Sequence, residues 1–185
     1  MAGLAGLATV PARADEALVM RLIFEDCLGY VRHGRTPFAG LATRPAPPAV
    51  IAELPARMPD RDKAVELLSP RYVASWGADA MARHCMVRTV FEAAQAGAPA
   101  KLGVRAAGFV ARVDARAKAA GLTQAETAER FSPIASNLWS EPGTGHESGP
   151  LRPVSLSLLA TTPPDADGIA DAGLFVMAGP PLPPR

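Results

Sequence analysis

Cysteine and histidine are the residues of this chain whose chemistry is easiest to test against known motifs, and there are two cysteines and three histidines. A zinc site needs three or four ligands at set spacings, and the sequence contains no CxxC, HxH or HExxH. His33 falls at the end of a predicted helix. His84 directly precedes Cys85 in a predicted strand, so their side chains point to opposite faces and cannot form a Cys–His pair. We therefore expect no metal site and no cofactor.

Hydrolytic chemistry has equally little support. There is no GxSxG, and no serine has the context of a nucleophile. The carboxylates of Glu25 and Asp26 are expected on the solvent face of a helix. One polar segment remains, residues 143–149, where His146 and Glu147 lie among glycines; it lacks GxxxxGK[ST] and is flanked by proline, so it is not a phosphate loop. We assign no catalytic residue and expect that the protein is not an enzyme.

Binding residues are easier to suggest than catalytic ones. Aromatic residues make up only 5% of the chain, so the two tryptophans stand out. Trp76, Trp139, His146 and Glu147 are the candidate binding residues. A ligand cavity between helix and sheet would place Trp76 and Trp139 close to Phe91.

The two cysteines are expected to form a disulfide. Cys27 lies on the apolar stripe of a predicted helix and Cys85 on the inner face of a predicted strand. Residues 1–14 are small and apolar and end in Ala12-Arg13-Ala14, which has the form of a signal-peptidase site, although no basic residue precedes Arg13. We read them as a signal-peptide remnant that places the protein in the periplasm or outside the cell, where cysteines pair. The alternative is an ordinary flexible N-terminus with two free thiols.

These residues must be positioned by a helix and a set of strands. Apolar residues recur at steps of three and four through residues 15–34, which predicts a helix that ends at Gly34. The density of proline predicts an ordered loop over residues 35–61. Alternating or short apolar runs predict six strands, at residues 63–68, 71–76, 84–93, 134–140, 154–162 and 173–179. Helical patterns cover residues 104–120 and, after a capping box at Thr123, residues 124–130.

Strands that come in runs predict an α+β fold with an antiparallel sheet. We expect a single domain over residues 15–179, followed by a loose proline-rich tail at 180–185. Its sheet should have about five or six strands, with the first helix packed on one face and the other two helices between the strand runs. There is no internal repeat.

Net charge and the length of the apolar runs argue against two classes of protein, those that bind nucleic acid and those that span a membrane. Lys and Arg number 19 against 18 acidic residues in a chain of 185, so no basic surface for nucleic acid is expected. No apolar run approaches the roughly 18 to 20 residues of a membrane span. The first hypothesis is a non-catalytic exported domain that binds a protein or envelope component through a sheet edge or residues 141–150. The alternatives are a carrier of a small apolar ligand and a hydrolase-type enzyme with a site around His146.

Overall fold

The structure is a computed structural model that describes residues 16–52, 54, 60–68, 71–80, 82–89, 106–124, 135–142, 154–160 and 172–180. Residues 1–15, which include the expected signal-peptide remnant, lie outside this described part. Within it the chain is an α+β fold built on an antiparallel sheet, as its sequence predicts.

The first helix is continuous but changes its hydrogen bonding in the middle. It consists of α1 (Glu16–Arg21), a π-helical segment η1 (Leu22–Cys27) and α2 (Leu28–His33). Gly34 ends it with a φ of 67°, and its N–H donates to the carbonyl of Tyr30 at 2.8 Å. Glycine adopts this left-handed conformation without steric cost, so the predicted helix end is confirmed.

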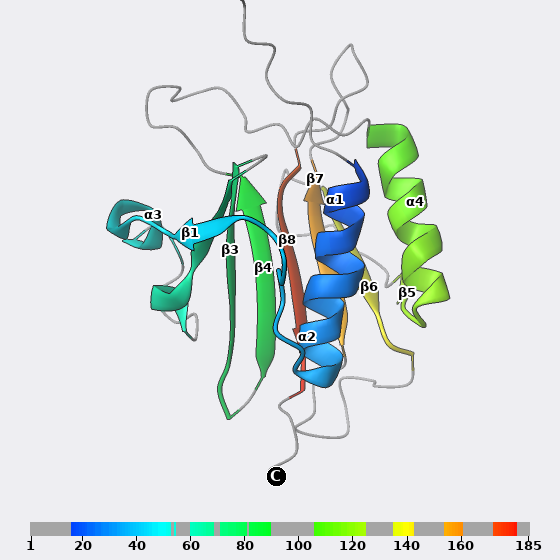
Figure 1. The fold of residues 1–185 in the computed structure, drawn as a ribbon. Helices are drawn as coiled ribbons and strands as arrows, with labels where there is room; N and C mark the ends of the chain where they lie inside the picture. The colour runs from blue at the N-terminus through cyan, green and yellow to red at the C-terminus, as the bar shows by residue number, and fades with distance from the viewer. Residues whose placement is uncertain are drawn as a thin grey trace, which may run out of the picture.

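Eight strands pair in one antiparallel sheet within the described residues, in the order β1-β2-β3-β4-β8-β7-β6-β5 (Figure 1). The strands are β1 (Thr43–Pro45), β2 (Val65–Leu68), β3 (Arg71–Ala78), β4 (Arg83–Thr89), β5 (Thr123–Gln124), β6 (Ala135–Ser140), β7 (Ser155–Ala160) and β8 (Ala172–Gly179). Six of them correspond to the six predicted runs. The two additional strands, β1 and β5, are short and form the two edges, so the expected count of five or six is too low. The last strand of the chain, β8, lies at the centre and joins the two halves.

Edge strand β1 ends at Pro45, although proline lacks the backbone N–H that strand pairing uses. Ala46 N–H donates to Ala64 O, and Ala42 O accepts from Leu68 N–H, so the backbone groups of alternate residues point toward β2. The backbone groups of Pro45 therefore point away from the sheet, where its missing N–H removes no ladder hydrogen bond.

The second long helix is α4 (Ala106–Ala119), close to its predicted range. Gly121 follows it with a φ of 78°. The third helix is not found where the capping box predicted its start. Thr123 and Gln124 instead form β5, and the Thr123 hydroxyl donates to Ser140 O at 3.3 Å across the strand pair. Residues 125–130, the remainder of that prediction, lie outside the described residues.

Both helices pack on the same face of the sheet and lie side by side (Figure 1). The Arg112 guanidinium binds the Glu16 carboxylate near one end, and Arg32 Nη2 donates to Ala120 O at 2.8 Å near the other. The main core fills the space between this helical layer and the sheet. Its fully buried large side chains include Leu22, Ile23, Tyr72, Phe109, Leu122, Trp139, Leu156 and Leu158.

A smaller core covers the opposite face of β2, β3 and β4. The short helix α3 (Pro48–Ala52) packs there with Ala46 and Leu54 over Val73 and Met86. Successive strand residues point to opposite faces, so these two side chains alternate with those that face the long helices. The segment predicted as a proline-rich loop thus contains β1 and α3, and its last residue begins a 3₁₀ turn, η2 (Arg61–Lys63).

Candidate functional site

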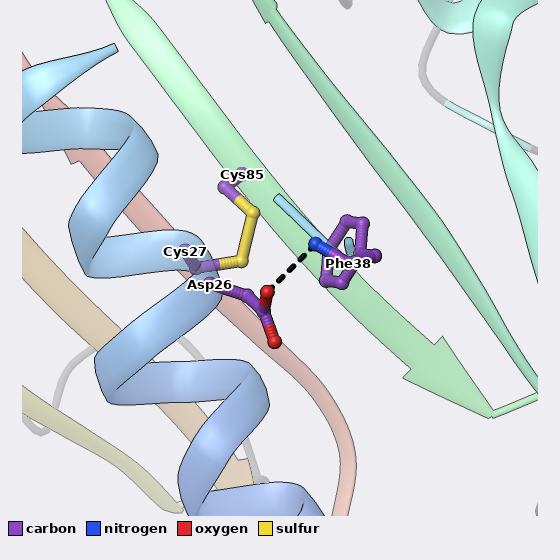
Figure 2. The surroundings of a disulfide bond; sticks show 4 residues. All are labelled: Asp26, Cys27, Phe38 and Cys85. Carbon is purple, nitrogen blue, oxygen red and sulfur yellow. Dashed lines mark hydrogen bonds between the residues drawn. A yellow bond between two sulfur atoms is a disulfide. The ribbon is translucent and has the colours of Figure 1, made fainter. Parts of the chain in front are cut away.

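The disulfide between Cys27 and Cys85 ties the first helix to the centre of the sheet (Figure 2). Both side chains are fully buried, their Cα atoms are 5.3 Å apart, and 58 residues separate them in the sequence. The predicted pairing is confirmed. The helix contributes Cys27 from the last residue of its π-helical segment, and β4 contributes Cys85 from the face that the helix covers. Because both sulfur atoms are bonded to each other, neither is a thiol nucleophile.

Asp26, next to the disulfide, is the least expected residue of this region. The sequence places it on the solvent face, but its side chain is only 9% exposed. The wider π-helical turn changes the angular position of residues 22–27, so a pattern of strict 3.6-residue period assigns Asp26 to the wrong face. Asp26 Oδ1 accepts a hydrogen bond from the backbone N–H of Phe38 at 2.7 Å (Figure 2). Its Oδ2 lies 3.4 Å from Arg21 Nε.

Burial raises the pKa of the Asp26 carboxyl above its ordinary value. The hydrogen bond from Phe38 and the positive charge of Arg21 oppose this rise, because both favour the carboxylate, but desolvation is the larger effect. The side chain is therefore a buried carboxyl group whose principal contact is a backbone donor. It fixes the loop that follows the helix.

That loop holds a strained residue. Phe38 has a φ of 62°, a left-handed conformation that bulky side chains rarely adopt. Its ring is buried and meets the ring of Trp76 edge-on, with centroids 5.3 Å apart and an interplanar angle of 67°. Arg21 Nη2 also donates to Ala39 O at 2.7 Å. Two helix residues thus hold consecutive loop residues, and the aromatic contact helps to offset the backbone strain.

The candidate binding residues do not come together. Trp76 lies half-buried on β3, and Trp139 is fully buried on β6, with β4, β8 and β7 between them. Four strand spacings of about 4.8 Å place these positions on the order of 19 Å apart. Phe91, His146 and Glu147 lie outside the described residues.

Sequence reasoning missed four polar residues on the opposite sheet face: Glu66 on β2, Ser75 on β3, and His84 and Arg88 on β4, which share that face with Val73 and Met86. Glu66 and Ser75 are fully buried, and the Glu66 carboxylate pairs with the guanidinium of Arg44. The signal was present in the alternation of these strands, since every second residue must face away from the long helices. Because the sequence analysis did not predict that α3 covers this face, its residues would have been assigned to the solvent-exposed side of the sheet.

In the part of the chain that the structure describes, no group of three or more His, Cys, Asp or Glu residues is arranged to hold a metal ion. None of the described helices is long and apolar enough to cross a membrane. The chain matches no protein-family model, no curated protein and no solved structure. Its function must therefore be argued from its own residues.

Replacing Asp26 tests whether its effect on folding stability comes from the hydrogen bond that it accepts or from its buried charge. Asp26→Ala should lower the free energy of unfolding by about 1–3 kcal/mol, because the buried N–H of Phe38 loses its acceptor. Asp26→Asn should cost less, since its amide oxygen can accept the same hydrogen bond without a buried charge. Urea denaturation monitored by tryptophan fluorescence measures both changes.

The same variants carry a defined pH dependence. Because the folded pKa of Asp26 is raised above 3.8, the stability that it contributes is fully present below pH 3.8 and is lost as pH rises through the folded value. Wild type should therefore lose stability relative to Asp26→Asn between pH 4 and neutrality. Glu25→Gln, one residue away and exposed, should reduce this pH dependence without abolishing it, because the Glu25 charge adds to the rise in the Asp26 pKa. A wild-type advantage over Asp26→Asn that grows with pH would contradict a buried, desolvated carboxyl group.

Proposed function

We propose that the protein is an exported, non-catalytic domain that binds a partner protein or envelope component. The observation that carries this proposal is the fully buried disulfide between helix and sheet. Structural disulfides form and persist in oxidising compartments and are rare in reducing ones. A cross-link in the middle of the core also suits a rigid scaffold better than a protein that must open its core to work.

The partner contact would lie where the 34–42 loop crosses the sheet beside the first helix (Figure 1). We call this the Trp76 surface; its residues are Arg21, Ala39, Gly40, Leu41 and Trp76. Trp76 is half-buried, the Arg21 side chain is 37% exposed, and Ala39 and Gly40 are exposed. Tryptophan and arginine are enriched in protein interfaces, where a rigid aromatic side chain gives contact area at low entropic cost. The Asp26–Phe38 hydrogen bond and the disulfide hold this surface rigid before any partner arrives.

The compartment is tested by the intact mass of the chain expressed with its upstream region and recovered from the cell envelope, with and without reductant. Export predicts a mature chain that begins at Asp15 and gains the mass of two hydrogens, about 2 Da, on reduction. A full-length chain in the cytosol with two free thiols would overturn the proposal.

The contact is tested by a photo-crosslinking amino acid at position 39, introduced into the full chain in its own cells. Position 115, exposed on α4 away from the loop, is the matched control. We expect a discrete adduct from position 39 that is absent from position 115 and is reduced by Trp76→Ala in a variant whose circular dichroism is unchanged. Equal labelling at both positions would remove the Trp76 surface as the contact.

A further inference from the structure

The Arg35 side chain lies over a helix residue that has no side chain of its own. Arg35 follows the end of the first helix, and its backbone N–H donates to Gly29 O at 3.4 Å. A Cβ atom at Gly29 would lie 3.0 Å from Arg35 Nη2, 3.1 Å from Nε and 3.2 Å from Cζ. Three atoms of one planar group are at nearly the same distance from that point, so the guanidinium presents mainly its flat face to the helix.

The guanidinium of Arg35 has no partner among the residues that the structure describes. Arg35 is exposed, and its side chain makes neither a hydrogen bond nor an ion pair with any of them. Glu25 lies one helical turn before Gly29 and is also exposed, yet it does not pair with Arg35. The N–H groups of a guanidinium lie in its plane. Those of Arg35 therefore point along the surface, where another molecule can accept them.

This guanidinium adjoins the Trp76 surface. The loop after the first helix turns back along the helix before it crosses to β1 (Figure 1). Arg35 contacts the helix at Gly29, and Ala39 further along the loop accepts the 2.7 Å hydrogen bond from Arg21. Gly29 and Arg21 are roughly two helical turns, or about 11 Å, apart along the helix. A partner that covers the Trp76 surface can therefore reach Arg35 as well.

Gly29 makes this arrangement possible at some cost to the helix. Glycine is one of the least favourable residues in a helix interior, and alanine is the most favourable. An alanine Cβ at position 29 would displace the guanidinium, because 3.0 Å is shorter than an ordinary contact between such atoms. Exposed ion pairs are weak partly because long side chains lose rotational freedom when they form them. An arginine that already lies against Gly29 loses less of that freedom and should bind an anion more strongly.

We propose that Arg35 is a pre-positioned carboxylate-binding residue beside the Trp76 surface and that it binds an acidic side chain of the partner. This inference rests on the proposed function, because it names the chemistry of the partner at the same contact. The N–H groups of a guanidinium match the two oxygens of an aspartate or glutamate carboxylate, and such bidentate pairs are among the stronger polar contacts. The partner is then a protein segment that places a carboxylate next to the group that contacts Trp76.

The first test is a titration of the full oxidised chain with a capped hexaglutamate peptide. NMR of the arginine Nε–H groups follows it at about pH 6, where glutamate is ionised. Arg116, which is exposed on α4 and has no partner among the described residues, is the internal control. We expect the Arg35 signal to saturate at a peptide concentration about threefold lower than the Arg116 signal, a difference in the range of exposed ion pairs.

The matched variant is Gly29→Ala, which keeps the charge of Arg35 but fills the space under its guanidinium. The helix should remain intact by circular dichroism, because alanine favours it, and the Arg35 and Arg116 signals should then respond alike. An Arg35 response no stronger than that of Arg116, or one that survives Gly29→Ala, overturns the proposed role. A selective response to inorganic phosphate but not to the peptide overturns the assignment to carboxylates.

The second test uses the crosslink from position 39 in the full chain in its own cells. Arg35→Gln should lower the yield of the adduct about threefold, and Arg35→Lys should restore it only in part, because lysine has no planar group to lie on Gly29. Arg116→Gln should leave the yield unchanged. An adduct that is insensitive to Arg35→Gln overturns the role of Arg35 but leaves the Trp76 surface as the contact. Absence of any adduct from position 39 removes that contact, and the titration alone then decides whether Arg35 binds carboxylates.

Discussion

Replacement of both Cys27 and Cys85 by alanine is expected to lower the free energy of unfolding by about 4 kcal/mol. The disulfide closes a loop with a sequence separation of 58 residues, and cross-linking a loop of that length restricts the unfolded chain by about this amount. Both side chains are fully buried, so the loss of sulfur packing adds to the effect. Guanidinium denaturation of wild type and variant, followed by far-UV circular dichroism, measures the difference.

Reduced wild type is the natural control, because it retains both sulfur atoms and lacks only the cross-link. We expect it to account for most of the loss, and the double variant to be slightly less stable. A denaturation midpoint unchanged by reduction would show that the helix is held on the sheet by packing alone.

The longer elements of this fold could be predicted because each carries its own repeated signal. The helix at residues 16–33 shows three- and four-residue spacing over many residues, and each of the six longer strands corresponds to an apolar run. The edge strands β1 and β5 have only three and two residues, too few to establish a period. They form because a neighbouring strand offers unpaired backbone groups, which is a tertiary cause that local sequence does not record.

The central position of β8 could not be predicted for a related reason. Alternation in a single strand shows which residues share a face, but it does not name the neighbouring strand. The C-terminal strand pairs with β4, which ends about eighty residues earlier in the chain, and this pairing joins two antiparallel halves. The expectation of one antiparallel sheet was confirmed, whereas its order came only from the structure.

The disulfide is the part of the candidate site that could be predicted from the sequence. Two cysteines on the inner faces of a helix and a strand predict the disulfide and the packing of one element on the other. Asp26 was assigned to the solvent because the π-helical segment is invisible to a regular helical pattern. The left-handed backbone of Phe38 is held by an acceptor from the helix twelve residues earlier, which the local sequence of the loop does not show.

Replacement of Trp139 is expected to have the other large effect, through the attachment of α4 to the sheet. The side chain is fully buried on β6 among core residues of α4, and its indole N–H donates to Asp114 Oδ1 at 2.9 Å. Trp139→Ala removes the largest fully buried side chain and should cost about 3–5 kcal/mol, because the surrounding backbone can only partly close the cavity. Urea denaturation measures the loss in free energy of unfolding, and hydrogen exchange of the α4 amides shows whether that loss is concentrated in this helix.

Trp139→Phe separates packing from hydrogen bonding, since it keeps most of the buried ring but removes the donor. It should cost clearly less than Trp139→Ala and should make a further Asp114→Asn substitution nearly neutral, because the interaction between the two residues is already lost. Asp114 also pairs with Lys118 on the exposed side of α4, so Lys118→Gln controls for that contact. If Trp139→Ala leaves α4 exchange unchanged while total stability falls, the tryptophan supports the sheet but does not dock the helix; a loss confined to α4 would show that this helix depends on one aromatic side chain for its position.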